Sequence, residues 1–237
     1  MNYKILAIIP ARGGSKGIHK KNIKILKNHP LIAYSINVCK NAHSISRFIV
    51  STDDMEIADI AKHYGAEVPF MRPSEFALDD TPDKPVFVHT LDWLKEKEGY
   101  LPDFVLHIRP TAPFRTEKDI ESVINIWKEA QCDSVRSVSL IDATSHPYWA
   151  YVDKNNWGYS YINDPKIKQF HRRQLLPPLY KANGLVDGYT PHSIYNSEDM
   201  LGKKMKLHII PDKVDIDTIE DFEYAEFLLE RKKVKGI

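Results

Sequence analysis

The stretch that decides the fold is KILAII (residues 4–9), which runs directly into PARGGSKG (residues 10–17). The uninterrupted apolar run predicts a strand that is buried on both of its faces. The glycines that follow allow the backbone to turn so that its N–H groups point toward an anion. In open α/β sheets, ligands bind beyond the carboxyl ends of the parallel strands, which is where this loop would lie.

Apolar segments and helical patterns alternate over most of the remaining chain. Further strands are predicted near 47–51, 67–71, 103–109, 134–140, 184–189 and 205–210. Helices are predicted near 30–41, 54–64, 82–98, 116–130 and 218–232. Gly65 is placed to end the second of these helices, and Thr116 and Thr218 open capping boxes. The alternation predicts an α/β fold, a mostly parallel sheet with helices on both faces, in a single domain of residues 1–237.

The pattern is interrupted at about 141–182, a stretch rich in Tyr, Trp, Pro and Asn. We interpret it as an inserted subdomain of extended segments and loops. Exposed aromatic side chains in it would indicate a subunit interface; a minor core beneath a long loop explains the same residues equally well. The aromatic residues in question are Trp149, Tyr151, Trp157 and Tyr159.

Charge and cysteine content exclude several classes of protein. The 237 residues include 33 Lys plus Arg and 32 Asp plus Glu, a balance that argues against a nucleic-acid partner. Cys39 and Cys132 lack metal-ligand spacing and are expected to be buried thiols in a reducing compartment. The apolar start is too short for a signal peptide or a membrane span. We therefore expect a cytoplasmic protein with no membrane partner.

Basic residues cluster in and just after the glycine-rich loop: Arg12, Lys16, Lys20 and Lys21. Fixed positive charge beside turned backbone N–H groups favours binding of a triphosphate. The loop has neither the spacing of a Walker A motif nor that of the dinucleotide fingerprint. A glycine-rich turn with solvated lysines is the alternative, and the position directly after the first strand weighs against it.

A pair of carboxylates, Asp215 and Asp217, lies just before the last predicted helix. Residues two apart on an extended segment point to the same side, so the pair can hold a hard cation such as Mg²⁺, or Mn²⁺ in its place. Helix capping is the alternative, and it would be preferred if the motif stood alone. Together with a phosphate loop, the motif favours a metal site.

Several loops after strands carry arginine. In RPTAPFR (residues 109–115), two prolines fix a loop whose Arg109 and Arg115 could bind a carboxylate or phosphate. A rigid connection with surface arginines explains the motif equally well. RPSEFA (72–77) and RRQLLP (172–177), the latter followed by KANG (181–184), are weaker candidates, since each alone reads as a surface loop. The histidines show no metal-ligand pattern, and His146 is expected to be a loop residue.

Taken in order, these motifs resemble the acylneuraminate cytidylyltransferases, the CMP-sialic acid and CMP-nonulosonate synthetases. The resemblance covers the length of the chain and rests on the set of motifs rather than on any one of them. The segments are IPARGGSKGIHKKNI (9–23), IVSTDD (49–54), MRPSEFA (71–77), RPTAPFRT (109–116), RRQLLP (172–177) with Asn183-Gly184, and DIDTIEDF (215–222). The family implies a Rossmann-like fold and a homodimer in which the inserted segment reaches the partner subunit.

The resemblance also implies roles for individual residues. The nucleotide site would comprise Ala11, Arg12, Gly13, Ser15, Lys16, Lys21, Asn22 and Arg72, the last two near the ribose and cytosine. Asp215 and Asp217 would bind Mg²⁺ and, with Lys16 and Lys21, carry catalysis. The sugar side would comprise Arg109, Thr111, Arg173 and Asn183.

Three positions depart from the sialic acid pattern, and all lie on the sugar side. Arg109 stands where glutamine is common, Trp149 where the partner subunit can offer a lysine, and Asp187 where a tyrosine is expected. The departures predict a sugar other than N-acetylneuraminate. We expect Arg109 to contact that sugar; the competing interpretation is that it only braces its loop through an internal salt bridge.

The predicted reaction couples CTP to an acidic nine-carbon sugar, a nonulosonic 2-keto-3-deoxy acid, and releases pyrophosphate. Other enzymes that fit the motifs are a Kdo cytidylyltransferase and a sugar-1-phosphate nucleotidyltransferase. A nucleotide-sensing module without activity is the alternative from another class, and the paired carboxylates beside the cationic loop argue against it.

Overall fold

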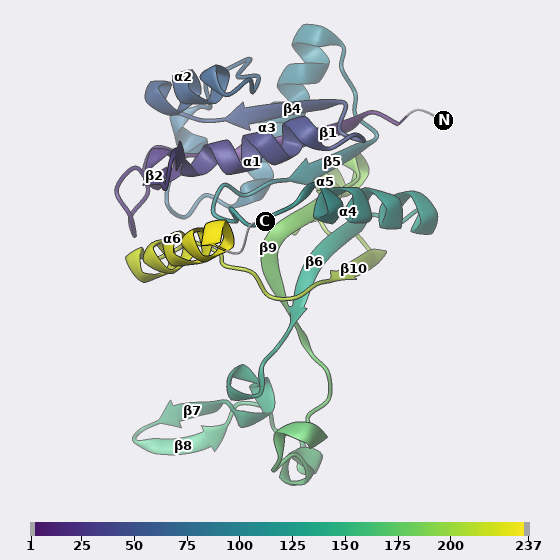
Figure 1. Cartoon of the computed structure of the whole chain (residues 1–237). Coiled ribbons are helices and arrows are strands. Elements are labelled where there is room, and N and C mark those ends of the chain that lie inside the picture. Colours follow the sequence, from purple (N-terminus) through teal and green to yellow (C-terminus); the bar gives the residue numbers. More distant parts are fainter. Residues whose placement is uncertain (1–2, 235–237) are drawn as a thin grey trace.

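The computed structural model describes residues 3–234, which form an α/β body with an arm projecting from it (Figure 1). The central sheet has the order β10-β6-β9-β5-β1-β4, and β9 alone is antiparallel to its neighbours. Its strands are β1 (Ile5–Pro10), β4 (Arg47–Ser51), β5 (Phe104–His107), β6 (Ser134–Leu140), β9 (Tyr180–Tyr189) and β10 (Met205–Ile209). The predicted mostly parallel sheet is confirmed.

The predicted helices are confirmed to within a few residues. They are α1 (Leu31–Asn41), α2 (Met55–His63), α3 (Asp83–Glu98), α4 (Glu117–Ala130) and α6 (Ile219–Val234). Thr116 and Asp119 form a complete capping box at α4, and Thr218 and Asp221 exchange the same hydrogen bonds at α6. Gly65 follows α2 with a φ of 95°, a left-handed conformation that favours glycine.

Alternate residues of β1 face opposite sides of the sheet, as the two-residue period of a strand requires. Ile5, Ala7 and Ile9 pack with α1, α2 and α4. Leu6 and Ile8 pack on the other face with α3 and with α5 (Pro191–Asn196), a short helix that the sequence did not predict. Helices therefore cover both faces, and a strand buried on both sides needs the continuous apolar run seen at 5–9.

A third apolar cluster packs α6 against the end of the glycine-rich loop. Ile18, at the end of that loop, and Ile216 pack with Phe222 of α6. The short ribbon of β2 (Ile25–Leu26) and β3 (His29–Pro30) joins the loop to α1. The loop after the first strand and the segment before the last helix are thus brought together.

The predicted strand at 67–71 is wrong. Glu67 forms a single parallel bridge with Ile49, and the pairing goes no further. Pro69 lacks the N–H group that a continuing ladder would need. The chain instead turns into the loop that carries Arg72.

The arm comprises the chain between β6 and β9 and stands clear of the sheet (Figure 1). It holds the antiparallel hairpin of β7 (Tyr151–Lys154) and β8 (Trp157–Ser160), together with short 3-10 turns. Those turns are η3 (Ala143–Ser145), η4 (Pro147–Trp149), η5 (Pro165–Gln169) and η6 (Arg173–Leu175).

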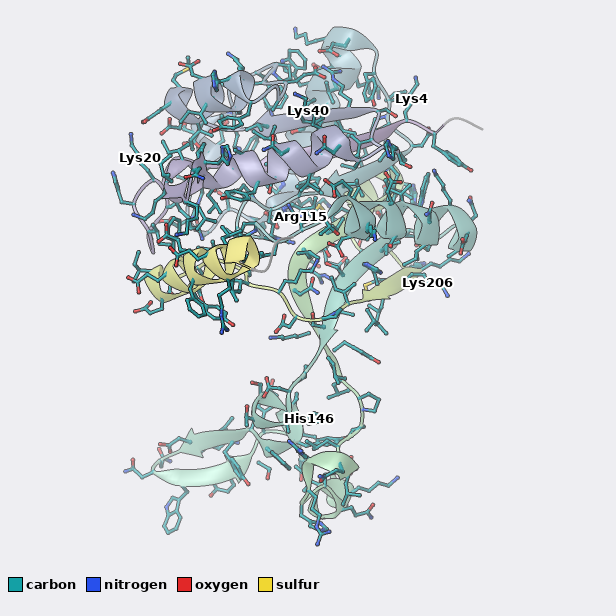
Figure 2. All side chains as sticks on the ribbon, in the orientation of Figure 1. Lys4, Lys20, Lys40, Arg115, His146 and Lys206 are labelled. Atoms are coloured by element: carbon teal, nitrogen blue, oxygen red, sulfur yellow. The ribbon has the colours of Figure 1, made fainter. Side chains whose placement is uncertain are left out.

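Of the aromatic residues predicted to be exposed on the arm, Tyr151, Trp157 and Tyr159 are exposed by 72, 72 and 52%. The expectation for Trp149 is wrong, because it is only partly exposed and its Nε1 atom donates to the carbonyl of Phe170 at 2.7 Å. His146 lies at the base of the arm (Figure 2), where its Nε2 atom lies 3.1 Å from the carbonyl of Pro177. It is a loop residue, as predicted. Across residues 3–234, no helix has both the length and the apolar character needed to cross a membrane.

Candidate active site

A cavity of about 550 Å³ opens at the carboxyl ends of β1 and β5. Its walls are the glycine-rich loop, the segment from Arg72 to Val86, the loop after β5, and the segment before α6. Most of the predicted site residues line it: Arg12, Ser15, Lys16, Lys21, Asn22, Arg72, Arg109, Thr111, Asp215 and Asp217. The fold therefore gathers motifs from both ends of the sequence into one pocket, which we call the nucleotide pocket after the site predicted from the sequence.

Ala11 and Gly13 hold the glycine-rich loop in place rather than lining the nucleotide pocket. Ala11 is fully buried, and its N–H group donates to the carbonyl of Ser51 at 3.0 Å. The N–H of Gly13 donates to Oδ1 of Asp53 at 3.0 Å. A Cβ atom on Gly13 would lie 2.8 Å from Oδ2 of Asp54, so the loop requires glycine here.

The same loop is joined to the carboxylate segment before α6. A Cβ atom on Gly17 would lie 2.6 Å from the carbonyl oxygen of Asp217. Lys21 donates from Nζ to the carbonyl of Ile216 at 2.8 Å and to Oδ1 of Asp217 at 3.1 Å. The phosphate loop and the predicted metal ligands are therefore in direct contact.

The remaining cations of the loop are also paired with carboxylates. Arg12 and Lys16 both contact Asp79, at 3.0 and 2.6 Å. Lys20 pairs with Glu56 on α2, at the outer edge of the body (Figure 2), and does not line the pocket. Asp79 was not singled out from the sequence, although it lies just beyond the RPSEFA motif.

Asn22 and Arg72 are buried in the wall of the nucleotide pocket. Asn22 donates from Nδ2 to the carbonyl of Arg12 at 2.9 Å. The guanidinium of Arg72 donates from Nε to Oγ of Ser51 at 3.1 Å and from Nη2 to the carbonyl of the same residue. Burial lowers the pKa of Arg72 to about 10, which still leaves it cationic at neutral pH.

The carboxylate pair before α6 has the character of an incomplete cation site. Oδ1 of Asp215 is buried and has no hydrogen-bond partner within the described chain. The side chain of Asp217 is 75% exposed and touches Lys21. Residues 3–234 contain no group of three or more His, Cys, Asp and Glu side chains that could hold a metal. Because Mg²⁺ takes octahedral oxygen coordination, two carboxylates fit it only if water or substrate oxygens supply the other ligands.

The side of the nucleotide pocket where the sugar is predicted to bind contains an ionic cluster around Arg109. Its Nη1 atom lies 3.1 Å from Oδ2 of Asp187, and its Nη2 atom lies 3.5 Å from Oδ2 of Asp83. Burial opposes the charge on Arg109, but the two carboxylates more than offset it and raise the pKa. The internal salt bridge considered as the alternative role of Arg109 is therefore present, on a side chain that also lines the pocket.

Arg115, the other arginine of this loop, makes its contacts inside the protein (Figure 2). It donates to Oγ of Ser35 at 2.8 Å, to the carbonyl of Arg109 at 2.7 Å and to the carbonyl of Leu185. The carbonyl of Thr111 accepts from the N–H of Ile216 at 2.8 Å. These bonds fix the loop after β5 against α1 and against the carboxylate segment.

Asn183 and Arg173 lie outside the nucleotide pocket. Asn183 is tied to β6 through Ser137 and Ser139, at 2.7 and 2.9 Å. It borders a second cavity of about 980 Å³, between β9 and α6, which shares Asp215 with the nucleotide pocket. Arg173 is carried by η6 on the arm and lines neither cavity.

Residues 6–234 match the family model described as cytidylyltransferase. The chain belongs to this family. It is 32% identical to a CMP-N,N'-diacetyllegionaminic acid synthase of Legionella pneumophila, over 96% of this chain and 97% of that one. It is 31% identical to a pseudaminic acid cytidylyltransferase of Campylobacter jejuni, over 95 and 96% of the two chains.

The same fold is found in a solved CMP:2-keto-3-deoxy-manno-octonic acid synthetase complexed with CTP. The TM-score is 0.74 at 16% identity, over 97% of this cytidylyltransferase and 99% of that chain. The family resemblance inferred from the motifs is confirmed, as is the expectation of a nucleotidyltransferase rather than a module without activity.

The nucleotide pocket of this cytidylyltransferase also contains residues that the motifs did not reveal. Asp79, Asp83 and His107 all line it. Asp79 lies in the loop that leads into α3, and Asp83 is the first residue of that helix, where an acidic residue is a helix-start signal. His107 carries no such signal, because it looks like any other residue of a buried strand.

Proposed function

We propose that this cytidylyltransferase couples CTP to a nonulosonic acid, giving a CMP-sugar and pyrophosphate. The observation that carries the proposal is the gathering of the cationic loop and the Asp215–Asp217 pair in one pocket. The sugar class is supported by relatives named for legionaminic and pseudaminic acids, which match over nearly the whole chain. A Kdo synthetase shares the fold at 16% identity, and this favours no substrate.

In the proposed reaction, the anomeric hydroxyl of the sugar attacks the α-phosphorus of CTP. A new P–O bond forms to the sugar oxygen, the hydroxyl proton is released, and the bond to the bridging oxygen of pyrophosphate breaks. Arg12, Lys16 and Lys21 would stabilise the charge that develops on the departing pyrophosphate. Positioning and electrostatic stabilisation account for most of the rate enhancement in such transfers.

Asp215 and Asp217 would hold the metal ion, Mg²⁺ or Mn²⁺. The buried and unpartnered Oδ1 of Asp215 supports this assignment, since a buried carboxylate oxygen needs a partner. A bound divalent cation would neutralise phosphate charge. Lys21 contacts Asp217 and so would keep this carboxylate beside the phosphate loop.

On the sugar side, Arg109 and Thr111 would act from the nucleotide pocket and Asn183 from the adjoining cavity. Arg173 lies on the arm, so it would reach this region only in another subunit. We propose a homodimer in which the exposed aromatic face of the arm packs on a second copy. Trp149 provides no cation there, because its side chain is uncharged, and its indole N–H donates to the carbonyl of Phe170 within the arm.

Two buried free thiols, Cys39 and Cys132, fit the proposal that the enzyme works in the cytoplasm. The reaction would then supply an activated acidic sugar to a glycosyl-transferring step.

The proposal is tested by measuring pyrophosphate release with Mg²⁺ across a panel of nucleotides and sugars. The nucleotides are CTP, UTP, ATP and GTP; the sugars are several nonulosonic acids, Kdo and a sugar 1-phosphate. We expect turnover with CTP and at least one nonulosonic acid. Comparable turnover with GTP, or with Kdo in preference to every nonulosonic acid, would contradict the proposed function.

A further inference from the structure

The cations in and just after the glycine-rich loop are paired with three carboxylates in the described chain. These carboxylates differ in where they lie relative to the nucleotide pocket. Glu56, the partner of Lys20, lies outside the nucleotide pocket. Asp217, the partner of Lys21, belongs to the proposed metal pair. Asp79 lies inside the pocket and has no place in the chemistry described so far. It therefore needs an explanation of its own.

Asp79 makes the contacts that a phosphate group would make. One oxygen lies 3.0 Å from Nη2 of Arg12, and the other lies 2.6 Å from Nζ of Lys16. Arg12 also donates to the carbonyl of Leu78 at 2.7 Å. The hydrogen bond from Lys16 holds the pKa of the Asp79 carboxyl below its ordinary value, so the group is ionised at neutral pH.

We propose that Asp79 competes with the nucleotide triphosphate for Arg12 and Lys16 and thereby sets the affinity of the site for phosphates. The inference rests on the proposed function, because it takes these two side chains to be phosphate ligands. In the free enzyme the carboxylate forms ion pairs with both cations. When a triphosphate binds, its oxygens replace the carboxylate, and when pyrophosphate leaves, Asp79 takes the cations back.

The strength of the contacts suits such an exchange. The side chains of Arg12, Lys16 and Asp79 are 32, 77 and 44% exposed, so water and salt weaken the two ion pairs. A phosphate group carries more charge than a carboxylate and would displace it. Release of the product would be helped because the cations regain a partner within the chain as the anion departs.

Asp79 lies on a segment that connects the pocket wall to α3. Residues 78–83 form the wall of the pocket opposite the glycine-rich loop and lead into α3. Thr81 holds this turn through its hydroxyl, which donates to the carbonyl of Glu75 at 3.1 Å. The contacts of Asp79 and Leu78 with Arg12 join this wall to the glycine-rich loop, and loss of the carboxylate contact would leave only the Leu78 carbonyl on Arg12.

The test uses Asp79→Asn, with Asp80→Asn as the matched control. Asp80 is the adjacent exposed carboxylate and makes no ion pair within the part of the chain described. Inorganic pyrophosphate and CTP are titrated separately into the full-length protein by calorimetry, without sugar. Asp79→Asn should bind both about three- to tenfold more tightly, the range expected for losing two exposed ion pairs. Asp80→Asn should match the wild type within about twofold.

Equal or weaker binding by Asp79→Asn would overturn the inference, since it would mean that Asp79 orients the cations instead of competing for them. Asp79→Ser provides a second variant should the asparagine amide itself bind phosphate. If the wild type binds CTP and neither Asp79 variant binds it more tightly than the wild type does, only this inference is contradicted. Wild-type protein that binds neither CTP nor pyrophosphate contradicts the proposed function as well.

Discussion

The Nη1 atom of Arg109 lies 3.1 Å from Oδ2 of Asp187, a carboxylate that is only 1% exposed. These are two of the three positions at which the chain departs from the sialic acid pattern, and the structure joins them as one ion pair. Arg136 approaches the same oxygen with its Nε atom at 3.7 Å. The two departures are therefore the two halves of one ion pair, in which Arg109 lines the pocket and Asp187 is buried behind it.

Arg109→Gln should lower the free energy of unfolding by about 3 kcal/mol, because it leaves the buried charge of Asp187 without its nearest partner. Denaturant titration measures the loss. The double variant Arg109→Gln/Asp187→Asn should recover part of it, since the uncompensated carboxylate is gone. Equal losses in the single and double variants would contradict the coupling.

Kinetics of Arg109→Gln address the second role of this side chain. If Arg109 also contacts the sugar, the sugar KM rises or the sugar preference changes, while the KM for CTP stays within about twofold. Unchanged sugar kinetics in a correctly folded variant would leave only the bracing role.

Gly17→Ala should remove most activity, because the added Cβ would lie 2.6 Å from the carbonyl oxygen of Asp217 and push the loop away from the carboxylate segment. Gly14→Ala is the matched control, since a Cβ atom at Gly14 would meet nothing within 4 Å. Turnover at saturating CTP and sugar is compared for the two variants. Similar activity in both would mean that contact between the loop and Asp217 is not needed.

Asp217→Asn should leave the melting temperature within about 2 °C of the wild type, because this side chain is 75% exposed. Its turnover should fall at least about tenfold and recover in part at high Mg²⁺, since one charged ligand has been neutralised. The readout is initial rate against Mg²⁺ concentration. Wild-type turnover at limiting Mg²⁺ would remove Asp217 from the metal site.

The parts of this molecule that could be predicted from sequence are those that local chemistry determines. The apolar run at 5–9 is continuous because β1 is covered on both faces. The capping boxes at Thr116 and Thr218 predict where two helices begin, because they depend on neighbouring residues and not on how the helices pack. Pro69 shows the limit of such predictions. The apolar residues at 67–71 indicated a strand, but the missing N–H group of Pro69 ends the pairing after a single bridge. The expected bounds of the inserted segment and the roles of individual site residues remain predictions.

Contacts between distant segments could not be predicted in this way. Arg109 and Asp187 meet because β5 and β9 are neighbours in the sheet, and no feature of the sequence predicts that strand order. Asp79 reaches Arg12 across the pocket for a similar reason. The sequence shows that Asp79 and Asp187 are acidic, but only the fold shows which cations each one contacts.

Arg173 should act on the site of a partner subunit. Arg173→Ala and Asp217→Asn would each be nearly inactive alone if both residues are needed. When the two variants are mixed and allowed to exchange subunits, about a quarter of wild-type activity should return. Half of the dimers would then contain one subunit of each variant, and each such dimer would hold one intact site out of two. Light scattering checks that the protein is a dimer. No recovery on mixing, or an active monomer, would contradict action in trans.

His107 should make the stability of the fold depend on pH. Its side chain is 0% exposed, and burial, followed by repulsion from Arg109, Arg115 and Arg136, holds its pKa well below the ordinary value. The groups that face it also include Asp83, 3.8 Å from Nδ1, and the ring of Phe87 on α3, at 4.9 Å between centroids.

The sign follows from linkage. The unfolded chain binds a proton near pH 6.5, whereas the folded chain resists it, so the neutral form of His107 stabilises the fold. That stability is fully present above about pH 6.5 and is lost as the pH falls below it, with a slope of up to about 1.4 kcal/mol per pH unit. His89 and His208 have lowered pKa values as well and add to the same trend, so the test must isolate His107.

Denaturant titrations between pH 5 and 7.5 compare the wild type with His107→Gln and with His171→Gln, an exposed histidine of the arm. His107→Gln is expected to be less stable at pH 7.5, because the glutamine must fit a space shaped for imidazole, but to lose less stability on acidification. His171→Gln should follow the wild type at every pH. If the wild type and His107→Gln lose stability in parallel over this range, the pH dependence arises from other groups, and His107 is not buried as the neutral imidazole that its surroundings favour.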